Sequence, residues 1–431
     1  METNFILENF FNKTVFVTGI TGFLGKVFVE KILRIQPNVK KFFLLIRAAD
    51  DASAVQRLRD ELIPIVGDVS DPDLGLSANS RKMICQEADF IVNIAATTNF
   101  DERYDIALGI NTFGVMHTMN MARECLKLQV FLHVSTAYVH GEKSGILTET
   151  TFSMGHTLDG TNHLSISNEK EIVDRKLDEL KSQKCSQAEV KLAMKDLGLQ
   201  RARTHGWPNT YVFTKSMGEM LLGELKGDVP LVIIRPTIVT STYKDPFPGW
   251  IEGFRTVDAF AYSLAQGKMK FITADPHLIL DVNSCDPMIY QIGSSIRNPT
   301  KITAIRVGKF EIVPSMEDFY MRIARWHILP LKVIKLVNIV MCHYMNDYCQ
   351  KVERKLQFIV RLMELYRDYL CFKGRFDDKN TQELRGEMRS GISSSCSDEN
   401  AIYLEFDPMG IDWTDYFMNT HIPGSVKYVF K

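Results

Sequence analysis

The stretch that most restricts the fold lies near the N-terminus, where a β-branched run leads into closely spaced glycines. Thr14–Thr18 is a short apolar run typical of a buried strand, and Gly19-Ile-Thr-Gly22-Phe-Leu-Gly25 follows it directly. Apolar residues then recur at helical spacing, at Val27, Phe28, Ile32 and Leu33. The sequence therefore predicts a strand, a tight glycine turn and a helix in succession, the opening unit of a sheet with helical crossovers.

Five further segments are short and almost entirely apolar, and each predicts a strand: Lys41–Arg47, Ile63–Val66, Phe90–Ala95, Val130–Ser135 and Leu231–Ile234. Continuous rather than alternating hydrophobicity is typical of strands that are buried on both faces. The helical patterns between these segments supply the crossovers that parallel strands require. We therefore predict an α/β fold built on a Rossmann-type, doubly wound parallel sheet.

The chain is long enough for more than this sheet. At roughly 150 residues per domain, 431 residues predict two or three domains. The sequence becomes polar and charge-rich over about 142–206, where 169–198 has a helical pattern and no strand is evident, so we interpret this segment as a helical insertion. Residues 315–374 again have a helical pattern, and 386–400, with a Ser-rich centre, is typical of a connection.

Charge and composition exclude several classes of function. The 51 Lys and Arg residues balance 52 Asp and Glu residues to a formal net charge of −1, which argues against nucleic-acid binding through overall basicity. The eight cysteines include no C-x-x-C pair, and no histidines are spaced as metal ligands in an acidic context, so we predict reduced thiols and no metal site. Neither a secretory signal nor a membrane span is evident, which makes the cytosolic side of the cell the expected compartment.

The glycine turn predicts a dinucleotide site. Glycine lets a pyrophosphate approach backbone N–H groups where a Cβ would clash, and the positive end of the following helix attracts the phosphates. An ordinary glycine turn of an α/β domain is the alternative interpretation. The predicted cofactor contacts come from one segment of the chain: Gly19, Thr21, Gly22, Phe23, Leu24 and Gly25.

The end of the second strand selects between cofactors. An acidic residue there would accept hydrogen bonds from an adenosine ribose, whereas a cation pairs with a 2′-phosphate, and the residue is Arg47. This favours NADP over NAD, although Asp50 and Asp51 follow closely and a solvated surface arginine is the alternative. Asp68, after the third strand, is expected at the adenine edge, or else is a turn aspartate.

A phenol and an ammonium at helical spacing supply the candidate chemistry. Tyr211 and Lys215 are four residues apart, so on a helix they share a face and the ammonium can lower the pKa of the phenol. Beside a nicotinamide, Tyr211 would be a general acid for a carbonyl oxygen, and Lys215 would also hold ribose hydroxyls. The same spacing recurs at Tyr369 and Lys373, so the pattern alone is weak evidence.

The position of Tyr211 strengthens the prediction. It follows a strand whose end, at Ser135 and Thr136, carries hydroxyls beyond the carboxyl end of a central strand, where α/β sheets bind ligands. We expect Thr136, with Ser135 as second choice, to donate to a developing oxyanion; capping of a turn is the alternative. His133, two residues before Ser135 in the same strand, is most simply a core residue with satisfied hydrogen bonds.

The order of these motifs resembles that of extended short-chain dehydrogenases and, more narrowly, of plant alcohol-forming fatty acyl-CoA reductases. The broader resemblance rests on four segments: Thr18–Gly25, Val134–Tyr138, Trp207–Lys215 and Ile234-Arg-Pro236. The narrower one rests on three more, Val29–Leu33 with Gln36-Pro-Asn38, Gly293–Pro299 and Asp412–Gly424. Together they cover nearly the whole chain.

The resemblance implies an NADP-binding Rossmann-like reductase domain at 1–310 and a helical C-terminal domain of the fatty acyl-CoA reductase type at 311–431. It also implies an oxidoreductase that converts a long-chain fatty acyl-CoA into a primary alcohol through a bound aldehyde, with NADPH as cofactor and release of CoA. Tyr211 and Lys215 match the catalytic pair, which also contacts the cofactor, and Thr136 matches their hydroxyl partner. Asp68, Asn93 and Asn111 match further cofactor-binding positions, whereas Arg47 is predicted to bind the cofactor from its place after the second strand.

Two departures from the family pattern bear on activity. After Leu62 the chain reaches its third strand without the longer helical stretch of its relatives, and Leu280–Pro287 runs into Met288–Ser294 without an intervening helix. Losing a helix beside the substrate cleft could expose apolar surface and weaken or abolish activity. The alternative function is thus an inactive or impaired reductase-like protein that binds a lipid or a partner. A nucleotide-sugar epimerase or dehydratase on the same scaffold has little support.

A basic, apolar segment suggests where the protein works. Residues 326–345 are rich in apolar side chains interrupted by Pro330, Lys332 and Lys335, and 321–375 contain 11 basic residues against 4 acidic ones. This composition is typical of a peripheral membrane contact, or of a surface drawn to the acidic groups of CoA. A core helix pair with solvated basic faces is the alternative. We expect peripheral association with the cytosolic face of the endoplasmic reticulum, and the cytoplasm as second choice.

Overall fold

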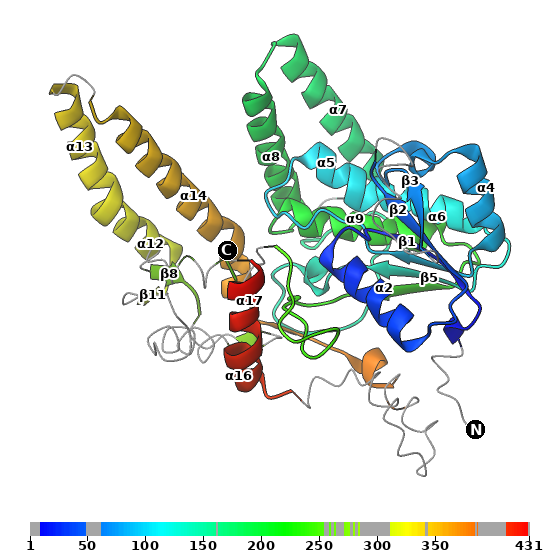
Figure 1. Cartoon of the computed structure of the whole chain (residues 1–431). Coiled ribbons are helices and arrows are strands. Elements are labelled where there is room, and N and C mark those ends of the chain that lie inside the picture. The colour runs from blue at the N-terminus through cyan, green and yellow to red at the C-terminus, as the bar shows by residue number, and fades with distance from the viewer. Residues whose placement is uncertain are drawn as a thin grey trace.

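The computed structural model describes residues 9–48, 62–160, 163–253, 258–259, 263, 271–275, 279–280, 283–284, 311–340, 344–383, 386 and 411–429. Its centre is a sheet of six parallel strands in the order β3-β2-β1-β4-β5-β7 (Figure 1). Their bounds are β1 (Thr14–Thr18), β2 (Lys41–Ile46), β3 (Leu62–Val66), β4 (Phe90–Asn93), β5 (Val130–Val134) and β7 (Leu231–Ile234). The strand order reverses between β1 and β4, which places a ligand-binding crevice at the carboxyl ends of these strands.

Helices cover both faces of the sheet, as the continuous apolar runs predict. Val15 and Val17 of β1 pack with Val29 and Ile32 of α2 on one face, whereas Phe16 lies in the core on the opposite face. The edge strand β7 departs from the prediction, because Val232 and Ile234 remain 44% and 45% exposed. The helical segments of this unit are α2 (Phe23–Ile35), η1 (Pro72–Gly75), α4 (Ala78–Glu87), α5 (Tyr104–Leu108), η2 (Gly109–Phe113), α6 (Gly114–Glu124), η3 (Ala137–His140) and α9 (Thr210–Leu225).

The predicted insertion is a pair of helices, α7 (Ile166–Ser182) and α8 (Gln187–Thr204), which project together from the sheet (Figure 1). A buried carboxylate anchors the pair: Glu169 of α7 accepts hydrogen bonds from Tyr104 of α5 and from Arg201 and His205 at the end of α8. The segment also contains a strand that the sequence pattern did not reveal, β6 (Gly145–Leu147). Its partner is β12 (Gly374–Phe376), more than 200 residues later, so no local pattern marks the pairing.

The C-terminal part is mainly helical, which confirms the helical pattern at 315–374. Its elements are α12 (Met316–Ile323), η4 (Ala324–Ile328), α13 (Leu329–Val340), α14 (Asn346–Leu370), α16 (Trp413–Asp415), η7 (Tyr416–His421) and α17 (Ile422–Tyr428). Short strands accompany them: β8 (Phe271–Thr273) pairs with β11 (Glu311–Val313), and β9 (Ile279–Leu280) pairs with β10 (Asn283–Ser284). The β8 pairing crosses the predicted domain boundary at 310, which stays a prediction.

One hydrophobic core joins the C-terminal helices to the insertion and to α9. It contains Tyr138, Met194 and Phe213 from the N-terminal part together with Phe319 and Met363 from α12 and α14. The far ends of α13 and α14 leave this core and project away from the sheet (Figure 1). The C-terminal helices are therefore held to the rest of the protein by a shared hydrophobic core.

The remaining sequence expectations concern membrane spans, metal sites, cysteines and the segments at the family departures. Within these ranges no helix is both long and apolar enough to cross a bilayer, and no cluster of His, Cys, Asp and Glu is placed to hold a metal. The described cysteines, including Cys85, Cys125 and Cys349, are free thiols. The segments next to both family departures, 49–61 and 285–310, lie outside the described residues, as do Asp50, Asp51 and the connection at 387–400.

Candidate functional site

The glycine turn after β1 has the geometry that a dinucleotide requires. Gly19 adopts a φ of +74°, and a Cβ there would lie 2.6 Å from the backbone nitrogen of Ala95 at the end of β4. A Cβ on Gly25 would lie 2.5 Å from the carbonyl oxygen of Gly19, so only glycine lets α2 start this close to the turn. The turn is therefore held tightly against the crevice between β1 and β4.

The start of α2 is suited to an anion. Gly22 is the N-cap residue and provides no side-chain cap, and the first turn of the 13-residue helix contains no acidic residue. Thr21 and Gly22 are exposed, whereas Phe23 and Gly25 are buried and Leu24 is half-buried. The N–H groups of the first turn and the positive end of the helix dipole can thus face a pyrophosphate. The residues present fit the predicted dinucleotide.

Arg47 and Asp68 lie next to each other at the carboxyl ends of β2 and β3. The Nε atom of Arg47 is 4.0 Å from Oδ2 of Asp68, and the arginine side chain is 72% exposed. Asp68 uses Oδ1 to accept hydrogen bonds from the backbone nitrogen and hydroxyl of Ser70, at 2.9 and 2.8 Å. Asp68 therefore shapes a turn, as the alternative interpretation holds, and contact of Asp68 or Arg47 with an adenosine stays a prediction.

Tyr211 and Lys215 share a face of α9, as their spacing predicts. The helix begins at Asn209, whose Oδ1 accepts a hydrogen bond from the backbone nitrogen of Val212 at 3.2 Å. Tyr211 is half-buried one residue into the helix, and Lys215 is buried one turn further along. The helix contacts the carboxyl end of β5, where Nζ of Lys215 donates to the carbonyl oxygen of Val134 at 2.7 Å.

Burial makes Lys215 unusual. The side chain is 1% exposed, and desolvation lowers its pKa to about 8, although the carboxylate of Glu219 raises it. Its second neighbour is His133 of β5, whose Nε2 lies 3.4 Å from Nζ. The sequence prediction assigned His133 to the core with no link to the catalytic pair. The contact requires β5 and α9 to be packed together, which no local pattern indicates.

The two hydroxyls at the end of β5 differ in their hydrogen bonds. Oγ1 of Thr136 accepts a hydrogen bond from the backbone nitrogen of Tyr138 at 3.3 Å and caps η3. Oγ of Ser135 is buried with no hydrogen-bond partner among the described residues. An accepting threonine hydroxyl keeps its own proton available, and an unpartnered buried hydroxyl is suited to a ligand. Both therefore remain candidates for the oxyanion donor.

The predicted cofactor residues Asn93 and Asn111 are buried and bonded to protein groups. Asn93 contacts Thr18 of β1 and His133 of β5. Asn111, in the π-helical segment η2, uses its amide to hold both backbone groups of Thr97 and the hydroxyl of Thr214 on α9. Asn111 therefore fixes the loop after β4 against the helix that carries Tyr211. Their contact with a cofactor stays a prediction.

An aromatic residue on that loop was missed by sequence reasoning. The ring of Phe100 stacks against Tyr211 with centroids 5.5 Å apart, and its other neighbours are Tyr366 and Tyr369 of α14, at 5.0 and 4.9 Å. Tyr369 is fixed by a hydrogen bond from Nδ2 of Asn209, and burial raises its pKa well above the usual value. Its partner in the second tyrosine–lysine pattern, Lys373, lies beyond the end of α14, so that pair shares no helix face.

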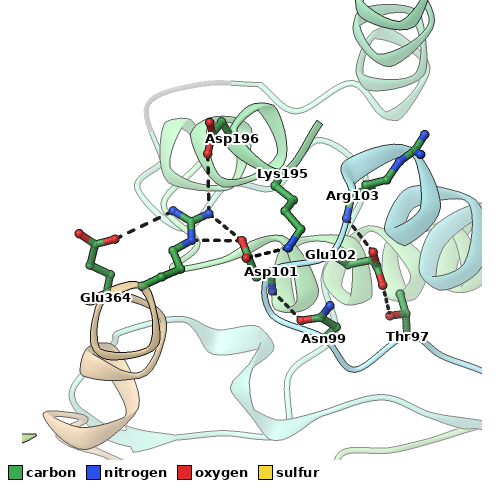
Figure 2. A network of polar contacts seen from close by, with 9 residues as sticks. Thr97, Asn99, Asp101, Glu102, Arg103, Lys195, Asp196 and Glu364 are labelled. Carbon is green, nitrogen blue, oxygen red and sulfur yellow. Dashed lines mark hydrogen bonds and ion pairs between the residues drawn. The ribbon is translucent and has the colours of Figure 1, made fainter. Parts of the chain in front are cut away.

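A cluster of charges holds the same loop (Figure 2). Oδ1 of Asp101 accepts hydrogen bonds from Nη2 and Nε of Arg361 on α14, at 2.6 and 3.2 Å, and Oδ2 accepts from Nζ of Lys195 on α8 at 2.9 Å. Asp101 therefore ties the insertion and the C-terminal helices to the loop that places Phe100 on Tyr211. No motif signals this residue, because its partners lie 94 and 260 positions away.

The segment after β7 connects the start of α2 to the C-terminus. Trp250 packs edge to face on Phe23 of the glycine turn, with centroids 5.3 Å apart, and Glu252 pairs with Lys26 of α2 at 2.8 Å. On the other side, the hydroxyl of Tyr416 donates to the carbonyl oxygen of Ser241 at 2.6 Å. The C-terminal helices thus reach the cofactor turn through this segment.

Comparison with known families places two matches on the chain. A family with an NAD-binding domain, described as "Male sterility protein", matches residues 17–292, and a second family with the same description, named "Sterile", matches residues 326–431. The terminal reductase domain of a myxalamid PKS-NRPS pathway shares the fold, with a TM-score of 0.52 over 97% of this chain and 92% of that one at 16% identity.

Two plant proteins are similar over their whole length. The chain is 43% identical to "Probable fatty acyl-CoA reductase 4" of Arabidopsis thaliana and 39% identical to "Alcohol-forming fatty acyl-CoA reductase" of Simmondsia chinensis, in each case over 100% of both chains. The first alignment is 498 residues long, 67 more than the 431 residues of this chain, so the Arabidopsis protein has stretches that this chain lacks.

Proposed function

The chain belongs to the family of plant fatty acyl-CoA reductases, and on that premise we propose that it reduces a long-chain fatty acyl-CoA to the primary alcohol with NADPH. The observation that carries the proposal is the placement of Tyr211 and buried Lys215 at the carboxyl end of β5. The glycine turn lies at the carboxyl ends of the strands of the same sheet. Full-length similarity to an alcohol-forming reductase supports the same reaction. The NAD-binding family match makes the cofactor a nicotinamide dinucleotide.

Arg47 supports NADPH over NADH. It is the first residue after β2 and its side chain is 72% exposed, so its guanidinium is accessible to a ligand, and its ion pair with Asp68 is a long one of 4.0 Å. An arginine fork binds phosphate oxygens in pairs, which a ribose hydroxyl cannot match. We expect Arg47→Ala to weaken NADPH binding at least about tenfold, or 1.4 kcal/mol, with little effect on NADH binding. Equal losses for both cofactors would contradict this assignment.

The chain supplies proton transfer and orientation at each reduction. Bound NADPH would supply one hydride to the thioester carbon and, in a second round, one to the aldehyde carbon. Tyr211 donates its phenol proton to the thioester oxygen as that oxygen becomes negative, while the Lys215 ammonium stabilises the phenolate left behind. Thr136 or Ser135 donates a second hydrogen bond to the same oxygen. This step leaves a neutral hemithioacetal.

The hemithioacetal must lose its thiol before the second reduction. The Tyr211 phenolate takes the hydroxyl proton back as the carbonyl re-forms and the C–S bond breaks, so CoA leaves as a thiolate that water protonates. Tyr211 is then a phenol again and protonates the aldehyde oxygen as the aldehyde carbon receives its hydride, which yields the alcohol and leaves a phenolate that solvent reprotonates. The two rounds together consume two hydrides and two protons for each acyl-CoA.

The test is a steady-state assay of purified protein with NADPH and acyl-CoAs of graded chain length, in which aldehyde is separated from alcohol by chromatography. We expect the wild-type protein to form alcohol. Tyr211→Phe should lower turnover by a factor of about 10² to 10⁴ while NADPH still binds. Tyr344→Phe, at a tyrosine 87% exposed in the turn before α14, should behave as wild type. Cofactor binding without product from any acyl-CoA would refute the proposal and favour a reductase-like binding protein.

We also propose that the projecting helices dock on a lipid bilayer, on the cytosolic face of the endoplasmic reticulum. The solvent side of α13 and its preceding turn carries an apolar stripe at helical spacing, which consists of Trp326, Leu329, Val333, Leu336 and Val340, each between 58% and 82% exposed. Leu331 on the opposite side packs with Cys349 and Leu356 of α14. The stripe is therefore additional to the apolar side that holds the helix pair together.

Charge favours an anionic bilayer as the occupant of this stripe. The same helix pair carries exposed basic residues, Lys332 on α13 and Lys351, Arg354 and Lys355 on α14. Lysines and arginines near an anionic surface contribute about 1 kcal/mol each, and each buried leucine or valine side chain about 1.5–3 kcal/mol. Apolar side chains with a basic border are the usual composition of an interfacial helix.

Vesicle flotation tests this surface. The full chain should float with phosphatidylserine-containing vesicles and less with pure phosphatidylcholine, and Leu336→Ser with Val340→Ser should abolish flotation. Leu126→Ser is the matched control, because Leu126 is 79% exposed on the sheet domain. Flotation of the double variant at the wild-type level would refute the proposal, as would stripe-dependent self-association without lipid binding.

A further inference from the structure

Three polar side chains form a row near the carboxyl ends of three neighbouring strands, in a sheet whose strands are mainly apolar. Thr18, Asn93 and His133 are register partners on the adjacent strands β1, β4 and β5. The hydroxyl of Thr18 donates to Oδ1 of Asn93 at 2.6 Å, and Nδ2 of Asn93 lies 3.2 Å from Nδ1 of His133. All three are at most 1% exposed. Buried polar groups are costly unless paired, so this row forms a hydrogen-bonded chain.

The chain of hydrogen bonds ends at the catalytic lysine. Nε2 of His133 is 3.4 Å from Nζ of Lys215, which also donates to the carbonyl oxygen of Val134 at 2.7 Å. The other end is fixed as well, because the backbone nitrogen of Ala95, beside Gly19, donates to the hydroxyl of Thr18 at 3.1 Å. A continuous polar path therefore runs from the glycine turn to Lys215.

The surroundings of this histidine disfavour its charged form. Burial, and then the nearby charge of Lys215, lower the pKa of His133 well below its usual value. An ammonium can only donate hydrogen bonds, so a charged Lys215 requires Nε2 of His133 as an acceptor and leaves the ring proton on Nδ1. That tautomer fits an Asn93 amide turned so that its oxygen accepts from the Nδ1 proton and its NH₂ donates to the Thr18 hydroxyl, which exchanges Oδ1 and Nδ2 in the contacts above.

A lysine needs such support because its side chain is long and flexible. Fixing it costs up to about 2 kcal/mol of rotamer entropy, and the carboxylate nearest along α9, Glu219, is occupied by Arg235. Among the described residues, the groups near Lys215 are thus His133 and the carbonyl oxygen of Val134 from β5, Glu219 from its own helix, and Tyr211, one turn earlier on the same face of that helix. Of these, only His133 is a side chain fixed by other strands of the sheet.

We propose that His133 is a positioning residue for the reduction. Asn93 and Thr18 hold its ring, and the ring holds the Lys215 ammonium where that group can reach Tyr211 and the cofactor ribose. The proposal rests on the proposed reductase function. It assigns a role to a histidine that touches neither substrate nor hydride donor.

Two conservative substitutions separate positioning from packing. In His133→Gln the amide takes the place of Nε2 and faces Lys215, whereas in His133→Asn it takes the place of Nδ1 and faces Asn93. We expect His133→Leu and His133→Asn to lower kcat about 10- to 100-fold, a loss of up to about 3 kcal/mol, and to move the alkaline limb of the kcat profile to lower pH. His133→Gln should retain most of the wild-type kcat and its pH profile. His117→Leu, at a half-buried histidine of α6, should change neither.

Equal activity of the Gln and Asn variants, or an unchanged kcat and pH profile in folded His133→Leu, would overturn the proposal, since a purely structural histidine would affect only stability. The pH dependence of the NADPH dissociation constant, measured by fluorescence titration in the same series, provides a second readout. If the wild-type protein turned over no acyl-CoA, the proposed function would fail, yet a shifted pH dependence of NADPH binding in His133→Leu and its restoration in His133→Gln would still support the positioning role.

Discussion

Replacing Asp101 with asparagine is expected to loosen the loop that covers Tyr211. The substitution keeps the shape of the side chain and one acceptor oxygen but removes the charge that Arg361 and Lys195 share. Charge-assisted hydrogen bonds contribute about 1.5–3 kcal/mol when shielded, and exposed ion pairs about 0–1 kcal/mol. The side chains of Asp101, Lys195 and Arg361 are 20%, 19% and 29% exposed, so the cluster lies between these limits. We therefore expect a loss of about 2 kcal/mol.

Urea unfolding and acyl-CoA turnover measure this effect together. The loss corresponds to a roughly 30-fold shift between the docked and undocked loop, so both the unfolding midpoint and kcat/KM should fall. Asp73→Asn is the matched control, because its carboxylate also binds one arginine, Arg81 at 2.9 Å, but is 72% exposed. It should cost no more than about 0.5 kcal/mol. Equal effects of the two substitutions would show that the cluster is only a surface feature, and unchanged kcat/KM in Asp101→Asn would break its link to Phe100.

Three further predictions concern the turn, the insertion and the lysine. A Cβ on Gly25 would lie 2.5 Å from the Gly19 oxygen but one on Gly22 would lie 3.3 Å from it, so Gly25→Ala should cost about 1–3 kcal/mol in thermal unfolding, while Gly22→Ala should weaken NADPH binding in a titration without that loss. Burial tends to raise the pKa of Glu169, but hydrogen bonds from three neighbours have the larger effect and lower it to about 2. Glu169→Gln should therefore cost about 3–5 kcal/mol of unfolding free energy at pH 7. Urea unfolding should show a smaller loss at pH 3, because the stability that comes from a lowered carboxyl pKa is lost as pH falls toward that pKa. Burial lowers the pKa of Lys215 to about 8, so activity should fall as pH rises through 8. The contribution of Lys215 to stability should instead rise between pH 8 and its usual pKa of 10.5. Measuring kcat and the unfolding midpoint over the same pH range tests the fall in activity and the rise in stability.

The sheet could be predicted from the sequence because its information is local. Each of the six apolar runs forms a strand, and all six lie in one parallel sheet. The predicted strands at Phe90–Ala95 and Val130–Ser135 end one or two residues early, at Asn93 and Val134. There the chain leaves the sheet at the crevice, which apolar content alone does not reveal.

The missed features share a physical cause, which is that they join residues far apart in the chain. The strand β6 is too short to be recognised and is stabilised by β12. Phe100 and Asp101 gain their positions from contacts with Tyr369 and Arg361 of α14, each more than 250 residues later. The exposed side of β7 follows from its place at the sheet edge, which depends on the strand order.

The sequence by itself determined the chemistry available to this protein: a glycine turn for phosphates, an arginine after the second strand, a phenol paired with an ammonium, and a family pattern along the chain. These features depend on residue type and short spacing, so they can be recognised in the sequence alone. The tertiary structure decided how that chemistry is held. Only packing of α9 on β5 buries Lys215 against His133, and only docking of α14 covers Tyr211 with Phe100, because desolvation and contact depend on what surrounds a side chain in space.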